Sequence, residues 1–195
     1  TATINFVATS GTQLLTMGST ATASSLTVNG AGGTTQLQDT FTINANITVS
    51  LGTLDTNNVA VRVNSFAISG AGVRTVTFGT SVIRFSTFSV SGSNYTISAA
   101  SATMQGTGAT QNNFTGAGQT YGTFLFDPTS ASGIKSTIND SNTFGAITFT
   151  PGNATPNPVL IFASGTTTTV TGTFTATGAT NGAITGLSRC NIGSD

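Results

Sequence analysis

The feature that most constrains the fold is an internal repeat in the middle of the chain. Residues 61–70 (VRVNSFAISG) and 83–92 (IRFSTFSVSG) match in residue type at each successive position. A large apolar residue recurs on both sides of this pair with a similar period, at Phe41, Phe66, Phe88, Phe114, Ile138 and Phe162. Regular repetition of this kind indicates stacked supersecondary units, each of which covers the apolar face of its neighbour.

The residues within each repeat alternate between apolar and hydroxyl side chains. Ile47-Thr48-Val49 and Thr75-Val76-Thr77-Phe78 are examples, and Gly, Asn and Ser separate such runs. A period of two places apolar side chains on one face of a strand. Threonine and valine also favour the pleated backbone, and no helical stripe occurs. The chain is therefore predicted to be all-β.

The repeat and the alternation together predict a parallel β-helix, or β-solenoid, with coils of about 22–26 residues. Stacked coils lie about 4.8 Å apart, so like residues must lie on like. A β-sandwich or jelly roll is the alternative, although its evenly spaced strands need not repeat one another's side chains. We expect six coils over residues 41–187, a cap or docking segment with irregular first coils over residues 1–40, and a short tail over residues 188–195.

The composition excludes several classes of function. Only 5% of the 195 residues are charged, the net charge is zero, and there is no His; all five acids are Asp, and Cys190 is the only cysteine. Zinc sites, histidine-based catalysis and an intrachain disulfide therefore cannot be built. Nothing favours nucleic acid, and no apolar run approaches the roughly 20 residues of a membrane helix. We expect no enzyme, no cofactor, and no catalytic, cofactor-binding or metal-ligating residue.

Four charged residues are candidates for a functional site. Arg62 and Arg84 share a repeat position and should lie one above the other outside the coils, either as a solvated pair or as a site for an anion or sugar. Asp127 and Asp140 could be a glycosidase pair if their carboxyl groups lay about 5–10 Å apart. Their separation of half a coil instead favours separate turns, and no acidic cluster offers the six or more oxygen ligands of a calcium site.

Two further patterns involve uncharged residues. Threonine occupies every odd position from 167 to 177, an arrangement found on ice-binding solenoids, although the preceding coils do not repeat it. An ordinary solvated sheet face is the expectation. Asn46, Asn94, Asn113, Asn139 and Asn153 match the glycosylation sequon, a weak signal in a chain so rich in Ser and Thr.

Three segments resemble a known pattern: residues 54–58 (LDTNN), 65–70 (SFAISG) and 74–79 (RTVTFG). They are similar to Thr/Ser/Gly-rich β-helical repeat proteins of bacteriophages and environmental viruses, and the likeness covers roughly residues 40–180. In that family the pattern commonly accompanies tail, fibre or capsid-surface proteins. The resemblance implies a structural role in the virion, as a capsid decoration, fibre or tail component, and no enzymatic activity.

These observations lead to two functional expectations. The first is a non-enzymatic structural protein of a virion or extracellular assembly, located on the virion surface or outside the cell. The alternative is an adhesin or receptor-binding fibre module that recognises a glycan. Because no charged residue precedes Asp39, open strand edges there invite association. We expect a homo-oligomer, a trimer by preference, together with other virion proteins, and residues 1–29 as either a docking segment or a first coil.

Overall fold

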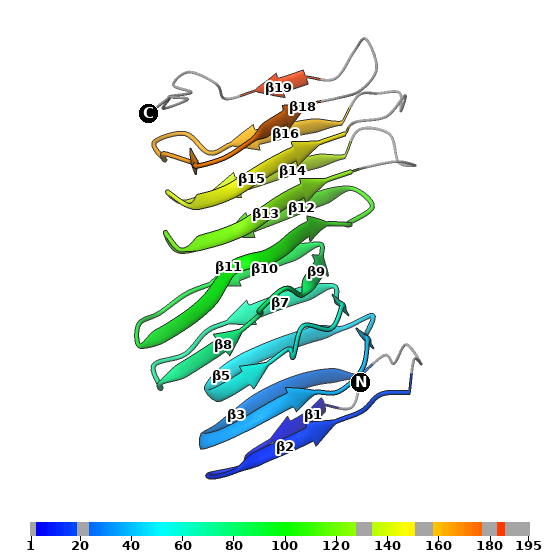
Figure 1. The fold of residues 1–195 in the computed structure, drawn as a ribbon, viewed down its shortest axis with the longest axis vertical. Helices are drawn as coiled ribbons and strands as arrows, with labels where there is room; N and C mark the ends of the chain where they lie inside the picture. The colour runs from blue at the N-terminus through cyan, green and yellow to red at the C-terminus, as the bar shows by residue number, and fades with distance from the viewer. Residues whose placement is uncertain (1–2, 19–23, 128–133, 151–157, 177–182, 186–195) are drawn as a thin grey trace.

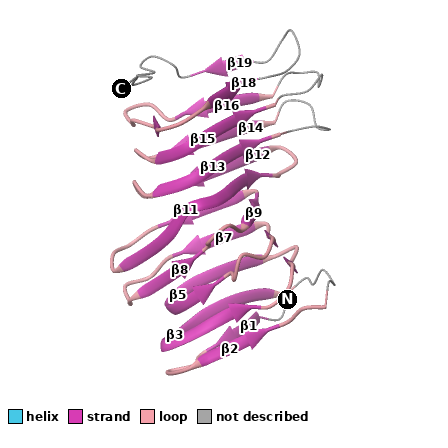
Figure 2. Cartoon of the chain, in the orientation of Figure 1, coloured by secondary structure: helices cyan, strands magenta, loops and turns pink. Residues whose placement is uncertain are grey.

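The computed structural model describes residues 3–18, 24–127, 134–150, 158–176 and 183–185. All regular elements in these residues are β-strands, which stack into one elongated solenoid of about seven turns (Figures 1 and 2). Each strand pairing is parallel. The predicted parallel β-helix is therefore confirmed, and the sandwich alternative, which is built of antiparallel strands, is wrong.

The strands line up along three faces of the solenoid. The first face contains β1 (Thr3–Phe6), the beginnings of β3 (Ser25–Leu37) and β5 (Asn46–Asp55), then β7 (Ser65–Ile68), β10 (Thr87–Val90), β12 (Gln111–Thr115), β14 (Lys135–Asn139), β16 (Val159–Phe162) and β19 (Ala183–Thr185). The second face contains β2 (Thr12–Leu15), the ends of β3 and β5, β8 (Arg74–Thr77) and the beginning of β11 (Tyr95–Gly106). The third face contains β4 (Phe41–Thr42), β6 (Val61–Arg62), β9 (Val82–Phe85), the end of β11, β13 (Thr120–Phe126), β15 (Thr143–Phe149), β17 (Thr169–Val170) and β18 (Phe174–Ala176).

The second face stops half-way along the solenoid. Its last strand, the beginning of β11, pairs with β8, whereas the pairing of β11 with β13 begins only at Ala99, opposite Tyr121. The register then skips, so that Thr103 lies opposite Thr123. Within the described residues, the coils from β3 to β11 therefore have three strand segments each, whereas the first coil has only β1 and β2, and the two coils after β11 have only two strands each.

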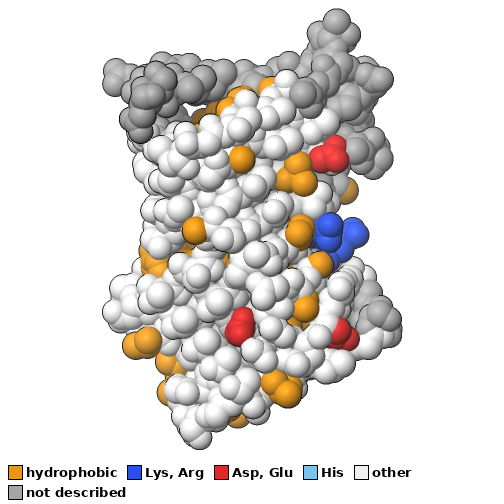
Figure 3. All heavy atoms as spheres, viewed as in Figure 1, with side chains coloured by type: hydrophobic (Ala, Val, Ile, Leu, Met, Phe, Trp, Pro, Cys, Tyr) orange, Lys and Arg blue, Asp and Glu red, His pale blue; other side chains and the backbone are white. Residues whose placement is uncertain are grey.

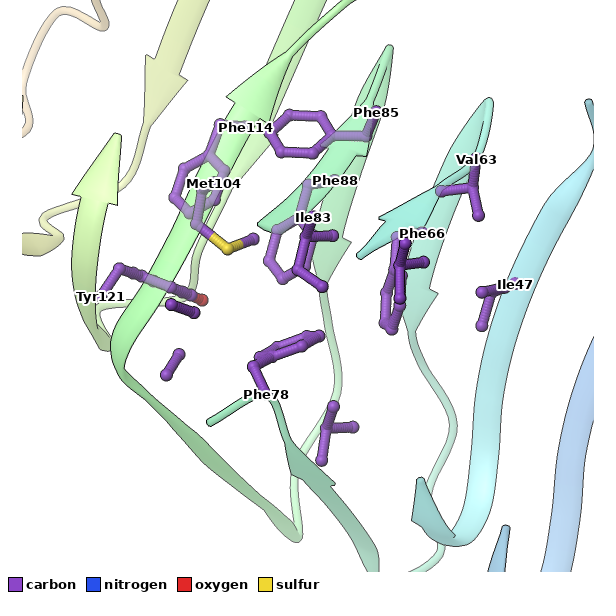
Figure 4. Packing of buried hydrophobic residues seen from close by; sticks show 14 of the residues in the cluster. Ile47, Val63, Phe66, Phe78, Ile83, Phe85, Phe88, Met104, Phe114 and Tyr121 are labelled. Atoms are coloured by element: carbon purple, nitrogen blue, oxygen red, sulfur yellow. The ribbon is translucent and has the colours of Figure 1, made fainter. Parts of the chain in front are cut away.

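A ladder of aromatic side chains runs through the core. Phe66 is in register with Phe88, Phe88 with Phe114, and Phe114 with Ile138. The rings of Phe88 and Phe114 stack with their centroids 5.0 Å apart and their planes 10° from parallel. Figure 4 shows Phe66, Phe88 and Phe114 pointing inward from adjacent strands. Phe162 follows Ile138 in the same column, so the predicted ladder is confirmed from Phe66 onward.

One member of the predicted ladder is wrong. Phe41 is buried in β4 on the third face, where it lies opposite Val61. The residue below Phe66 is Ile47, which follows Phe41 in the chain, and the next residue down the column is Leu26. The coil from Ile47 to Phe66 is shorter than predicted, and an aliphatic residue occupies the aromatic position. The prediction aligned Phe41 with Phe66 because both are phenylalanines, and it therefore assigned β4 in place of β5 to this column.

The predictions for the two ends of the chain are a cap or docking segment with irregular first coils over residues 1–40 and a short tail over residues 188–195. β1 and β2 pair in register with β3, so the stack of coils extends down to Thr3. Ile161 lies opposite Thr185 of β19, which is the last described strand. The predicted tail, residues 188–195, lies outside the described residues.

Candidate functional site

The two arginines of the repeat lie together on the third face. Arg62 of β6 is directly opposite Arg84 of β9, which confirms the predicted register. Arg62 is exposed, whereas Arg84 is half-buried and donates a hydrogen bond from its Nε to Oε1 of Gln105 at 2.9 Å. On the face drawn in Figure 3, the basic side chains form one group near the level of β9. Arg62 and Arg84 therefore place two guanidinium groups next to each other on the third face.

A pocket of about 190 Å³ lies beside this pair, at the corner where the third face leads into the first. We call it the corner pocket. Its lining residues are Ile43, Asn44, Arg62, Val63, Asn64, Ser86 and Thr107. Ile43 and Val63 are buried and close the apolar side, while the remaining residues present amide, hydroxyl and guanidinium groups. The corner pocket is therefore small, open and mainly polar.

The positive charge at the corner pocket is not neutralised by the protein. None of the cations in the described residues forms an ion pair with a carboxylate, and Arg62 has no hydrogen-bond partner there. Asp39 accepts hydrogen bonds from the backbone of Met17 and Gly18 instead. Asp55 accepts a bond from Gln36 on the second face. This arrangement can attract an anion.

The aspartates considered as a glycosidase pair follow strands on different faces. Asp127 follows β13 of the third face, and Asp140 follows β14 of the first face. Asp140 lies in a turn with a φ of 67°, and its Oδ2 accepts a hydrogen bond from the backbone N–H of Ala117 at 3.0 Å. Asp140 thus has the turn role that we predicted. In the described part of the chain, no three potential metal ligands cluster together.

The threonine row of residues 167–177 faces outward as expected, with Thr167, Thr169, Thr171 and Thr173 exposed; Thr177 lies outside the described residues. The coils below interrupt the row, because Thr175 lies over Thr148, which in turn lies over Leu125. Sequence reasoning missed a second array, which runs across the coils and not along one strand. Thr12, Thr34, Thr53, Thr75 and Thr96 occupy successive levels of the second face. These threonines are separated by about one coil length in the sequence, and this spacing could have revealed the array.

The predicted modification sites differ in accessibility. Asn46 is exposed at the start of β5. Asn94 is also exposed, but its Nδ2 donates a hydrogen bond to the carbonyl of Ala71 at 3.0 Å. Asn113 and Asn139 are half-buried, with their side chains hydrogen-bonded to Gln111 and Thr115 respectively. Asn153 and Cys190 lie outside the described residues.

Sequence reasoning also missed a buried cation. Arg74 is fully buried at the corner that leads into β8. Its Nη1 donates to the carbonyl of Ser91 at 3.2 Å, and its Nη2 donates to the carbonyl of Ser93. The guanidinium carbon lies 5.8 Å from the centroid of the Tyr95 ring, in cation–π range, while Nε has no partner. The sequence did contain a signal for this burial, because Arg74 is in the same alternating series as the inward-facing Val76 and Phe78.

Fold and surface define a parallel β-solenoid with an aromatic core and very few charges. The chain matches no protein-family model, no curated protein and no solved structure. No helix in the described residues could span a membrane. What the protein does must therefore be argued from its own geometry.

Proposed function

We propose that this chain is a non-enzymatic structural protein of a virion or another extracellular assembly, where copies associate with one another. The proposal is based on the first described coil, which no described strand covers. β1 and β2 pair only with β3, so their other edges have no partner among the described residues. Such edges present a row of N–H and C=O groups that pair readily with another chain.

The side chains at this end also favour association. Ile4, Val7 and Leu14 expose 41%, 60% and 64% of their surface. Phe6 and Leu15, which continue the inward columns of Val28 and Leu37, are only half-buried. Natural sheets usually protect a free edge with charge, yet residues 1–38 contain no charged side chain. This end of the described core is therefore apolar and is not covered by any other described residue, as a surface that becomes buried in an assembly would be.

The oligomeric state in solution tests this proposal. Light scattering on the purified chain should give a mass of several times 19.4 kDa, with three copies as our preferred number. Ile4→Lys should shift the population toward monomer, because Ile4 continues the inward column of Leu26 and a buried ammonium is costly at an apolar interface.

The matched control is Val73→Lys, which adds the same charge at a residue that is 70% exposed in the corner before β8. It should leave the mass unchanged. A wild-type chain that remains monomeric at millimolar concentration would overturn the proposal, and so would equal dissociation by the two variants. Circular dichroism establishes that both variants are folded.

A glycan-binding module of an adhesin or fibre is the second candidate, and the polar corner pocket favours it. Mass spectrometry of purified particles separates the two functions through copy number. A decoration or shell protein is present in many copies, whereas a receptor-binding fibre tip is scarce.

A further inference from the structure

The corner pocket contains a stack of uncommitted polar side chains. Asn44, Asn64 and Ser86 occupy the same corner in three successive coils. The backbone connects these levels, since the N–H of Asn64 donates to the carbonyl of Ala45 at 2.9 Å, and the N–H of Ser86 donates to the carbonyl of Asn64 at 3.0 Å. The side-chain amides of Asn44 and Asn64 are exposed and form no hydrogen bond within the described residues. Both amides are therefore available to a ligand.

The arginines beside this stack point to a negatively charged ligand. Arg62 and Arg84 are direct neighbours on adjacent parallel strands, which lie about 4.8 Å apart. Like charges placed directly opposite each other destabilise a sheet. No carboxylate of the described residues offsets this repulsion, and the acceptor that Gln105 offers to Arg84 is an uncharged amide oxygen. An anion bound at the pocket would relieve the repulsion.

We propose that the corner pocket binds a single sugar unit that carries a carboxylate, such as a uronic acid. The guanidinium of Arg62 would bind the carboxylate through paired, charge-assisted hydrogen bonds. The amides of Asn44 and Asn64 each offer both donors and an acceptor, which suits the hydroxyl groups of a sugar. The pocket, at about 190 Å³, is smaller than the roughly 300–1,000 Å³ of pockets for drug-sized ligands, so one ring is the unit it accommodates.

This site is independent of the assembly proposal, because it lies on the side of the solenoid rather than at the N-terminal coil. No covalent step is involved. The open, shallow geometry gives few contacts, and we expect a dissociation constant on the order of 1 mM for the monosaccharide. Tighter binding in a biological setting would come from several copies engaging one polysaccharide.

The test is an NMR titration of the chain with three probes. Glucuronic acid carries the carboxylate and the hydroxyls, glucose carries only the hydroxyls, and acetate carries only the carboxylate. We expect shifts at Asn44, Arg62 and Asn64, with glucuronic acid binding at least about tenfold more tightly than either other probe. Acetate binding as tightly as glucuronic acid would show a simple anion site and overturn the assignment of a sugar. An absence of glucuronic acid binding at concentrations about twentyfold above the expected dissociation constant would overturn the whole proposal.

Variants locate the site. Arg62→Gln should weaken glucuronic acid binding by about tenfold or more, because it removes a charge-assisted contact. Asn64→Ala should weaken it less. Lys135→Gln removes another exposed positive charge from β14, outside the pocket, and serves as the matched control that should bind normally. Equal losses in Arg62→Gln and Lys135→Gln would show that only the net charge matters, and would refute the site.

Discussion

Phe88 is the residue whose truncation tests the coil alignment most severely. Its side chain is fully buried and lies among five other aromatic rings. Its ring centroid is 5.6 Å from that of Phe66 and 5.0 Å from that of Phe114; the rings of Phe78, Phe85 and Tyr121 lie at 6.1, 5.7 and 6.0 Å. Phe88→Ala thus removes the centre of an aromatic cluster that spans several coils.

The expected cost follows from these contacts. Truncation of a buried Phe to Ala costs about 3–5 kcal/mol. Aromatic pairs add about 0.5–1.5 kcal/mol each beyond burial, so Phe88, with five ring neighbours, should lie near the upper end, at about 4–5 kcal/mol. For a chain of this length, 1 kcal/mol lowers Tm by about 2–4 °C, which predicts a fall of about 8–20 °C. Phe66→Ala should behave similarly, because Phe66 is also fully buried and stacks on Phe88.

Far-UV circular dichroism is the assay, because the chain contains no Trp to report unfolding by fluorescence. Thr173→Ala is the control: Thr173 is exposed, and its backbone carbonyl, which the substitution keeps, accepts the N–H of Ile147 at 3.0 Å. It should cost well under about 1 kcal/mol. Equal losses of Tm in Phe88→Ala and Thr173→Ala would refute the inward aromatic ladder.

Three other predictions concern the backbone ladder, a buried phenol and the buried cation. Gly145→Ala should destabilise the fold by about 1–3 kcal/mol, since its Cβ would lie 2.8 Å from the carbonyl oxygen of Gly122 in the coil below; a thermal melt measures the loss. Burial, with smaller contributions from Tyr95 and Asp140, raises the pKa of the Tyr121 phenol far above its ordinary value of 10. Because the unfolded phenol ionises first, stability should fall as the pH rises above about 10, and Tyr121→Phe should remove this component in urea melts at pH 8 to 11. Arg74→Ala should cost about 2–4 kcal/mol by urea unfolding, because it opens a cavity and leaves the carbonyls of Ser91 and Ser93 without their donors.

The sequence was sufficient for the fold class because a solenoid requires each coil to repeat the one below. The match between residues 61–70 and 83–92 was therefore a direct record of strand register, as the pairing of Phe66 with Phe88 shows. The same logic failed at Phe41, where the column changes from Phe to Ile47 and the coil shortens. The fold requires an inward-facing apolar side chain at each level of the column, but it does not require the same residue type. An alignment by residue type therefore fails where Phe is replaced by another apolar residue.

The candidate site was only half visible in the sequence. The shared repeat position predicted the contact between Arg62 and Arg84 correctly. The corner amides of Asn44 and Asn64 were missed, because residues between strands follow no alternation and are recognised only once the coils are aligned level by level. The end of the second face was missed for a related reason. Tyr95 and Tyr121 both begin short apolar runs in the sequence, but Tyr121 lies over Ala99 and not over Tyr95.

The end of the second face explains why an arginine is retained in a core that otherwise has almost no charge. The last strand of that face, Tyr95 to Ser98, pairs with β8 on one side and has no strand on the other within the described residues. A strand that is hydrogen-bonded along only one edge needs other contacts to fix its position. The corner before it has no apolar side chain that could pack into the core, since residues 91–94 are Ser, Gly, Ser and Asn. Arg74 supplies that order: its guanidinium binds two carbonyls of the corner and lies against the ring of Tyr95, the first residue of the strand. A neutral aliphatic side chain would fill the same volume but could satisfy neither carbonyl, so the free energy of desolvating the cation is offset by fixing the corner from which this strand begins.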